Sequence, residues 1–192
     1  LVDGDQLLWI LASAWHKAGQ LVGPVVGTLM SNLGLEVGLR KLGVDFRRAA
    51  VGDRYVLELL RETGGRLGGE SSGHLICLDK TTTGDGLVSA LQVLCVMKQS
   101  GRTLAELTAG MSRYPQKLVN VRVARKIDLK NASPVQAAVA RAEQQLGARG
   151  RVLLRASGTE PVVRVMVEGE DRDEVERLAD EIATCVRGAA SA

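Results

Sequence analysis

The 192-residue sequence is poor in aromatic residues, and this scarcity argues against a nucleic-acid-binding protein. Aromatic residues make up 3% of the chain: Trp9, Trp15, Phe46, Tyr55 and Tyr114. Proteins that bind single strands stack bases on aromatic rings and follow the phosphates with a gathered basic surface. Here 25 Lys and Arg stand against 22 Asp and Glu, and the positive residues are scattered. Nucleic acid is therefore not an expected partner.

Long apolar runs are also missing. The longest, Leu7 to Ala12, is six residues, whereas a membrane-spanning helix needs about 20. The chain does not open on a basic and then apolar leader with a small-residue cleavage site. We therefore expect a cytoplasmic protein with no membrane partner. Apolar residues still make up 45% of the sequence, which is enough to bury a core.

Cysteine and histidine are too sparse for a disulfide framework or a zinc site. The three cysteines, Cys77, Cys95 and Cys185, are odd in number and widely spaced. Their Leu, Ile and Val neighbours are typical of buried thiols in a reducing compartment. His16 and His74 are the two histidines, and their spacing excludes a two-histidine site on one helix. We assign no metal ligand to this sequence.

Three familiar catalytic or ligand-binding patterns fail on inspection. The segment 69–73 matches Gly-x-Ser-x-Gly, but the histidine that follows Ser71 is His74, three residues on, so a hydrolase triad is excluded. The segment 3–5 resembles the start of a calcium loop, yet Leu7 occupies the next alternate position. No Gly-Lys pair occurs, which excludes a Walker A loop.

Helical periodicity alternates with short β-rich runs, a pattern typical of an α/β protein. Over the first part of the chain we predict helices at 5–17, 34–42, 53–63 and 85–99, a short helix from Thr103, and strands at 21–30, 44–50 and 74–78. On the helix over 85–99, Leu87, Leu91 and Leu94 form one apolar stripe, which we expect to face the core.

The pattern changes near residue 112. From there the sequence predicts β-α-β-β-α, with strands at 116–123, 151–155 and 162–168 and helices behind Ser133 and Asp171. This order over about 80 residues fits a small open-faced α+β sandwich. We therefore predict two domains, a mixed-sheet α/β domain over 1–111 and the sandwich domain over 112–192.

The segment Gly68 to His74 is the first with chemical potential. Its glycines let the backbone approach a ligand closely, while Glu70 and Ser72 can exchange hydrogen bonds with sugar hydroxyls. The imidazole of His74 is the side chain best suited to general acid or base work near neutral pH. From these residues alone, a polar connecting loop without function stays open as an alternative.

The second segment runs from Arg155 to Arg164. Its two guanidinium groups flank the hydroxyls of Ser157 and Thr159 and the backbone N–H of Gly158, a set that can hold a phosphate dianion without a metal. A hairpin turn with flanking surface arginines is the alternative. Together the two segments offer a place for a hexose ring and a place for a phosphate.

These two segments resemble the α-D-phosphohexomutase family. The residues over 68–86, GGESSGHLICLDKTTTGDG, are similar to the sugar-binding loop of its third domain, and RVLLRASGTEPVVRVMVE over 151–168 is similar to the phosphate-binding loop of its fourth. TTTGDG and the VGDRYV segment over 51–56 are most similar to the family's bacterial phosphoglucosamine mutase branch. The resemblance implies a C-terminal half, with a short remnant of the preceding domain at its start.

The resemblance also implies a reaction and a set of residues. Members of this branch interconvert glucosamine 6-phosphate and glucosamine 1-phosphate through a phosphoserine and a bisphosphate intermediate. Glu70 and Ser72 would bind ring hydroxyls, and His74 would carry a proton near the reacting oxygen. The residues expected to face the substrate with less defined roles are Gly52, Asp53 and Arg54. Those expected to hold the phosphate that is not transferred are Arg155, Ser157, Gly158, Thr159 and Arg164.

Two parts of the family's machinery are absent from the sequence: the phosphorylated serine and the Asp-x-Asp-x-Asp-Arg magnesium loop of its first two domains. Phosphoryl transfer depends on electrostatic stabilisation that these groups supply. We therefore expect this chain to bind a phosphosugar without turning it over, with Mg²⁺ held by an N-terminal half that would be its partner. A phosphomannomutase or phosphoglucomutase fragment and a stand-alone phosphosugar-binding module stay open, as does the oligomeric state.

Overall fold

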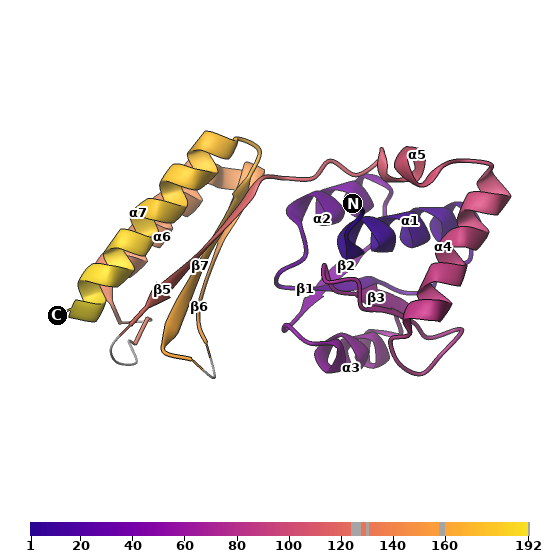
Figure 1. Ribbon diagram of the computed structural model, residues 1–192, viewed down its shortest axis with the longest axis horizontal. Coiled ribbons are helices and arrows are strands. Elements are labelled where there is room, and N and C mark those ends of the chain that lie inside the picture. The colour runs from indigo at the N-terminus through magenta and orange to yellow at the C-terminus, as the bar shows by residue number, and fades with distance from the viewer. Residues whose placement is uncertain (124–127, 130, 158–159, 192) are drawn as a thin grey trace. The chain divides into compact units, whose positions relative to one another are not determined.

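The computed structural model describes residues 1–123, 128–129, 131–157 and 160–191. The chain divides into two compact units, Leu1–Arg113 and Tyr114–Ala192 (Figure 1). Each unit has its own hydrophobic core. Among the described residues, no helix has the length and apolar character that a membrane span requires.

The first unit is built on a four-stranded mixed sheet of order β2-β1-β3-β4. The strands β1 (Val25–Thr28), β2 (Phe46–Ala49) and β3 (Leu67–Gly69) are parallel, and β4 (Leu75–Cys77) runs antiparallel to β3. Its helices are α1 (Gly4–Lys17), α2 (Leu33–Lys41), α3 (Asp53–Thr63), α4 (Gly86–Ser100) and α5 (Leu104–Thr108). The mixed sheet confirms the predicted α/β class.

Helices cover both faces of this sheet. Successive strand residues point to opposite faces, so a strand of consecutive apolar residues needs a helix on each side. Val25 and Leu75 pack in the cluster that includes α1 and α2, whereas Val26 and Ile76 pack in a second cluster with α3. In Figure 1, α3 accordingly lies on one side of the strands and α1 and α2 lie on the other. The sheet is thus the middle layer of three.

The sequence predicted the ends of the helices well and the strands less well. The predicted helix over 53–63 coincides with α3, which ends at Gly64 in the left-handed region (φ 71°). The strand predicted over 21–30 is confined to β1, because Gly23 has φ 65° and Pro24 follows it. β3 was not predicted, since two of its three residues are glycines of low strand propensity.

The prediction for the buried face of α4 was wrong. The three leucines of its predicted core-facing stripe are exposed: Leu87 80%, Leu91 59% and Leu94 55%. The side that packs in the first unit holds Ser89, Val93 and Val96. α4 has no charged residue from Gly86 to Met97 and has apolar residues on opposite sides, so periodicity could not identify the side that this unit buries.

The second unit is a three-stranded antiparallel sheet of order β5-β7-β6, packed on two helices. Its strands are β5 (Gln116–Arg122), β6 (Gly150–Ala156) and β7 (Val162–Gly169), and its helices are α6 (Ser133–Leu146), the short η1 (Gly147–Arg149) and α7 (Arg172–Ser191). Its core contains alternate β7 residues such as Val163 and Val165, with Leu146 from α6. This arrangement confirms the predicted β-α-β-β-α sandwich.

Candidate functional site

The predicted sugar-binding residues of the first unit gather at one edge of its sheet. β1, β2 and β3 are parallel, so their carboxyl ends lie together. The segment with Gly52 and Asp53 follows β2, and the loop from Glu70 to His74 follows β3. Open α/β sheets bind ligands at this carboxyl edge. The two segments are therefore at the position where a ligand site is expected from topology.

A hydrogen bond joins these two segments. The backbone N–H of Gly52 donates to Oε1 of Glu70 at 2.9 Å. Gly52 has φ 130°, a conformation that favours glycine, and it is the N-cap of α3. A carboxylate offers about four lone-pair sites, so this bond leaves Glu70 able to accept from a ligand. Glu70 thus holds the site together in addition to its predicted role.

His74 lies beside Asp53, with Nε2 3.8 Å from Oδ2. The two side chains are 45% and 48% exposed, so both are accessible to a ligand. Gly84 makes room for the imidazole ring, because a Cβ on Gly84 would overlap Cδ2 and Nε2 of His74. Gly84 also bridges to Ile76 of β4, which fixes its position. Sequence reasoning did not assign a role to Gly84.

The start of α1 supports the same loop. Gly4 donates its N–H to the carbonyl of Ser71 at 3.0 Å, and a Cβ on Gly4 would overlap the carbonyl oxygen of Glu70. Within the loop, Gly73 donates to Glu70 at 3.0 Å and has φ 99°. Ser72 is exposed in this turn. Gly4 is a second supporting residue that the sequence did not reveal, and its only signal was a glycine at a helix start.

Arg54 is directed along the surface of α3. Its Nε lies 2.9 Å from Oε1 of Glu58, one turn further along the helix. This hydrogen bond raises the pKa of Arg54 above its ordinary value. The structure therefore brings together Gly52, Asp53, Glu70 and His74, whereas Arg54 is paired with a helix neighbour.

In the second unit, Arg155 and Arg164 are direct neighbours on adjacent antiparallel strands. Residues paired in this way have side chains on the same face, and like charges there are destabilising unless an anion lies between them. Asn120 of β5 pairs with Arg164 on its other side, which adds an amide that sequence reasoning missed. The carboxylate of Glu160 partly offsets the repulsion between the two arginines, because its Oε2 lies 3.8 Å from the guanidinium of Arg164.

Ser157 shapes the turn that follows Arg155. Its N–H donates to the carbonyl of Val162 at 2.8 Å, and its hydroxyl accepts from the N–H of Glu160 at 3.3 Å. The predicted phosphate ligands Gly158 and Thr159 lie outside the described residues. The structure thus places Arg155, Ser157 and Arg164 around one hairpin end.

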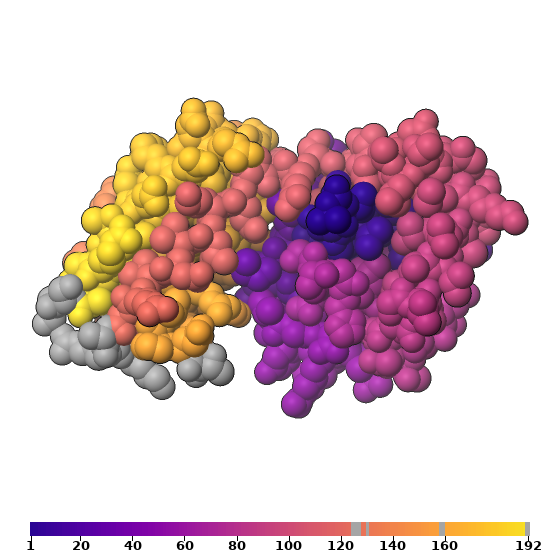
Figure 2. Space-filling view, in the orientation of Figure 1, coloured from indigo at the N-terminus to yellow at the C-terminus, as the bar shows by residue number. Residues whose placement is uncertain are grey.

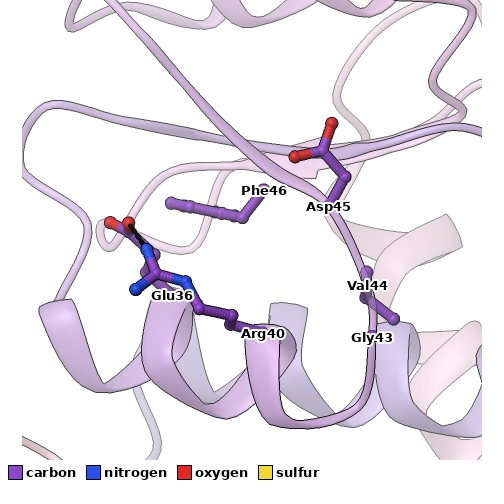
Figure 3. A pocket seen from close by; sticks show the side chains of 6 residues that line it. All are labelled: Glu36, Arg40, Gly43, Val44, Asp45 and Phe46. Atoms are coloured by element: carbon purple, nitrogen blue, oxygen red, sulfur yellow. Dashed lines mark hydrogen bonds and ion pairs between the residues drawn. The ribbon is translucent and has the colours of Figure 1, made fainter.

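The described residues of these segments do not form a metal site. In the part of the chain that the structure describes, no group of three His, Cys, Asp or Glu residues could hold a metal ion. The described residues therefore do not fit Mg²⁺. A pocket of about 300 Å³ lies near the amino end of β2, with the Glu36–Arg40 ion pair beside it (Figure 3). It is at the opposite edge of the sheet from Gly52 and Glu70.

Comparison with known families identifies the class of protein. Residues 3–114 match the phosphoglucomutase/phosphomannomutase alpha/beta/alpha domain III, and residues 118–184 match the C-terminal domain of the same family. The chain belongs to the phosphoglucomutase/phosphomannomutase family, which confirms the resemblance seen in the sequence.

Individual relatives narrow the comparison. The chain is 60% identical over 192 residues to phosphoglucosamine mutase from Methylococcus capsulatus, covering 100% of this chain and 43% of that protein. It is 61% identical over 189 residues to phosphoglucosamine mutase from Alkalilimnicola ehrlichii, covering 98% and 42%. The chain therefore spans less than half the length of these relatives.

A solved structure shares the fold. Aspergillus fumigatus N-acetylphosphoglucosamine mutase, in complex with GlcNAc-6P and magnesium, is similar with a TM-score of 0.81 and 23% identity. The similarity covers 97% of this chain and 47% of that one. At this identity the likeness extends to the fold and not to the ligands.

Proposed function

We propose that this chain is the phosphosugar-recognising part of a phosphoglucosamine mutase, an isomerase that interconverts glucosamine 6-phosphate and glucosamine 1-phosphate through a phosphoserine and a bisphosphate intermediate. The observation that carries the proposal is the 60% identity to a phosphoglucosamine mutase over all 192 residues. The product would serve UDP-N-acetylglucosamine and cell-wall synthesis in the cytoplasm.

In this proposal the carboxyl edge of the first unit recognises the sugar. Glu70 and Ser72 bind hydroxyls of the ring, and His74 moves a proton to or from the reacting oxygen. Asp53 lies close enough to His74 to favour one orientation of the imidazole, at 3.8 Å. Gly52 keeps the carboxylate of Glu70 in place through its N–H.

The hairpin of the second unit would hold the phosphate that is not being transferred. Arg155 and Arg164 lie directly opposite each other, so a bound dianion would remove their mutual repulsion and form charge-assisted hydrogen bonds. Ser157, Gly158 and Thr159 would complete this set. A substrate that binds in two orientations needs a fixed phosphate site, because binding energy at the remote end positions the reacting end.

The phosphoserine and Mg²⁺ would belong to the rest of the enzyme. The relatives are more than twice as long as this chain, which supports an additional N-terminal part as its partner. Without that part, the chain has residues for binding and, in His74, a group that carries a proton, but it lacks the serine and the magnesium loop on which phosphoryl transfer depends. We therefore expect the isolated chain to bind the phosphosugar and to show no turnover.

Isothermal titration calorimetry tests the proposal. Glucosamine 6-phosphate should bind the chain, and Arg155→Ala should weaken binding by about tenfold or more. Arg172→Ala is the matched control, because Arg172 is exposed and begins α7, beyond the other end of β7. Equal binding by Arg155→Ala and the wild type would contradict the phosphate site. Turnover by the pure chain would contradict the proposal that the transfer needs an N-terminal part.

The same titration separates the remaining alternatives. A fragment of a phosphomannomutase or phosphoglucomutase should prefer mannose 6-phosphate or glucose 6-phosphate to glucosamine 6-phosphate. A stand-alone binding module should retain its ligand without any effect of an added N-terminal part.

A further inference from the structure

α4 is largely apolar and has no charged side to expose over most of its length. From Gly86 to Met97 it contains no charged residue. A helix that is apolar all round is normally buried on all sides. The first unit buries one side, through Ser89, Val93 and Val96. The opposite side is left uncovered among the described residues.

That uncovered side consists of Leu87, Leu91 and Leu94, which we call the leucine face. The three side chains are 80%, 59% and 55% exposed, and their spacing of four and then three residues places them on one strip of the helix. Other large exposed apolar residues, such as Val22 and Leu118, stand singly in the sequence. Single exposed apolar residues are normal, whereas a contiguous apolar strip marks an interaction surface. Figure 2 shows the magenta to pink segment that includes α4 at the surface of the first unit.

We infer that the leucine face is covered by the part of the same enzyme that precedes the matched segment in its longer relatives. This inference rests on the proposed function, in which the chain is one part of a mutase. The matched segment is 43% and 42% of the length of two relatives, so they contain a large body of polypeptide with no counterpart here. That body precedes domain III, because the chain already includes the family's C-terminal domain.

The composition and place of the leucine face favour this occupant. The face has no charge for a partner to match, which is typical of a surface buried permanently within one protein. It also adjoins the site, because Leu87 lies in the first turn of α4, three residues after Gly84, which packs on His74. A body that covers the leucine face would therefore approach the loop where the proposed phosphoryl donor is needed.

A chimaeric enzyme tests this surface. In it, this chain replaces the matched segment of the Methylococcus capsulatus enzyme, and Cys95 serves as the reporter because it is exposed and one turn beyond Leu91. Peptide mass spectrometry measures the alkylation rate of each cysteine in the isolated chain and in the chimaera. The alkylation rate of Cys95 should be lower in the chimaera by a factor of about ten or more, as expected of a buried thiol. Cys185, in the second unit, is the control and should react at the same rate in both.

A substitution provides a second readout. Leu91→Gln should lower the melting temperature of the chimaera and leave that of the isolated chain unchanged, because the side chain is exposed in the chain alone. Leu118→Gln, 44% exposed on β5, is the matched control and should change neither.

Three outcomes would overturn the inference. Equal alkylation rates of Cys95 in the isolated chain and in the chimaera would show that nothing covers the face. A lower melting temperature of Leu91→Gln in the isolated chain would place the cover within these 192 residues. Sedimentation showing a dimer of the isolated chain that Leu91→Gln dissociates would identify a second copy. None of these measurements involves a phosphosugar. A negative result would therefore contradict the inference about the leucine face without contradicting the proposed phosphosugar binding.

Discussion

Gly52 and Glu70, 18 positions apart in the sequence, are joined by a 2.9 Å hydrogen bond from the backbone N–H of Gly52 to Oε1 of Glu70. This bond ties the segment after β2 to the loop after β3. Glu70 is therefore a structural tie as well as a proposed sugar ligand, and the two roles respond differently to substitution.

Glu70→Ala should lower the free energy of unfolding by about 1–2 kcal/mol, because the N–H of Gly52 loses its partner in a partly buried position. Glu70→Gln keeps an acceptor oxygen and should lose less. Urea unfolding measures both variants, and calorimetry with glucosamine 6-phosphate measures the second role. If Glu70→Ala is as stable as Glu70→Gln, the bond does not contribute to holding the two segments.

Gly84→Ala should displace the imidazole of His74, because the new Cβ would overlap two of its ring atoms. The ring is half exposed and free to turn away, so stability should change by less than about 1 kcal/mol. The ring signals of His74 in NMR spectra should shift, while those of His16 serve as an internal reference. Gly86→Ala is the matched control, since a Cβ there meets nothing within 4 Å. Equal shifts in both variants would remove the proposed role of Gly84.

Arg164→Ala should have opposite effects with and without ligand. Without ligand it removes a like charge facing Arg155, so stability should stay the same or rise by about 0.2–1 kcal/mol. With glucosamine 6-phosphate at a hundred times its Kd, the wild type should gain about 2.7 kcal/mol. The variant should gain far less under the same conditions. Thermal unfolding measures both, and an equal gain in both proteins would show that Arg164 does not hold the phosphate.

The buried thiol of Cys77 should make the stability of the protein depend on pH. Burial raises the pKa of this thiol to about 11, whereas an unfolded cysteine titrates near about 8.5. Between these values the unfolded thiol ionises and the folded one does not. Stability should therefore fall as pH rises through that window, by about 1.4 kcal/mol per pH unit at most.

Chemical unfolding from pH 8 to 11 measures this slope. The stability of Cys77→Ala should fall less steeply with pH than that of the wild type, although the variant is less stable at pH 8 because of the cavity left in the core. Cys95→Ala is the control, since Cys95 is exposed, and its slope should match the wild type. A slope in Cys77→Ala identical to that of the wild type would mean that other groups carry the dependence.

Much of the architecture could be predicted from local signals. The helix over 53–63 was predicted residue for residue, because Gly64 ends it and its amphipathic pattern is strong. The short helix from Thr103 was predicted from a capping box, and Thr103 and Glu106 form that box in the structure. The site was less visible, because Gly4 and Gly84 act by leaving space for neighbours that are distant in the sequence.

The amino-acid sequence by itself determined the α/β class, the family and the two segments that we propose as binding segments, because capping, periodicity and long motifs are properties of neighbouring residues. Tertiary structure alone decided the pairing of Arg155 with Arg164, the bond from Gly52 to Glu70, and the side of α4 that the first unit buries. Each of these depends on which distant segments pack together. For α4 no local rule could have chosen, since both of its sides are apolar and only a neighbour determines which one is covered.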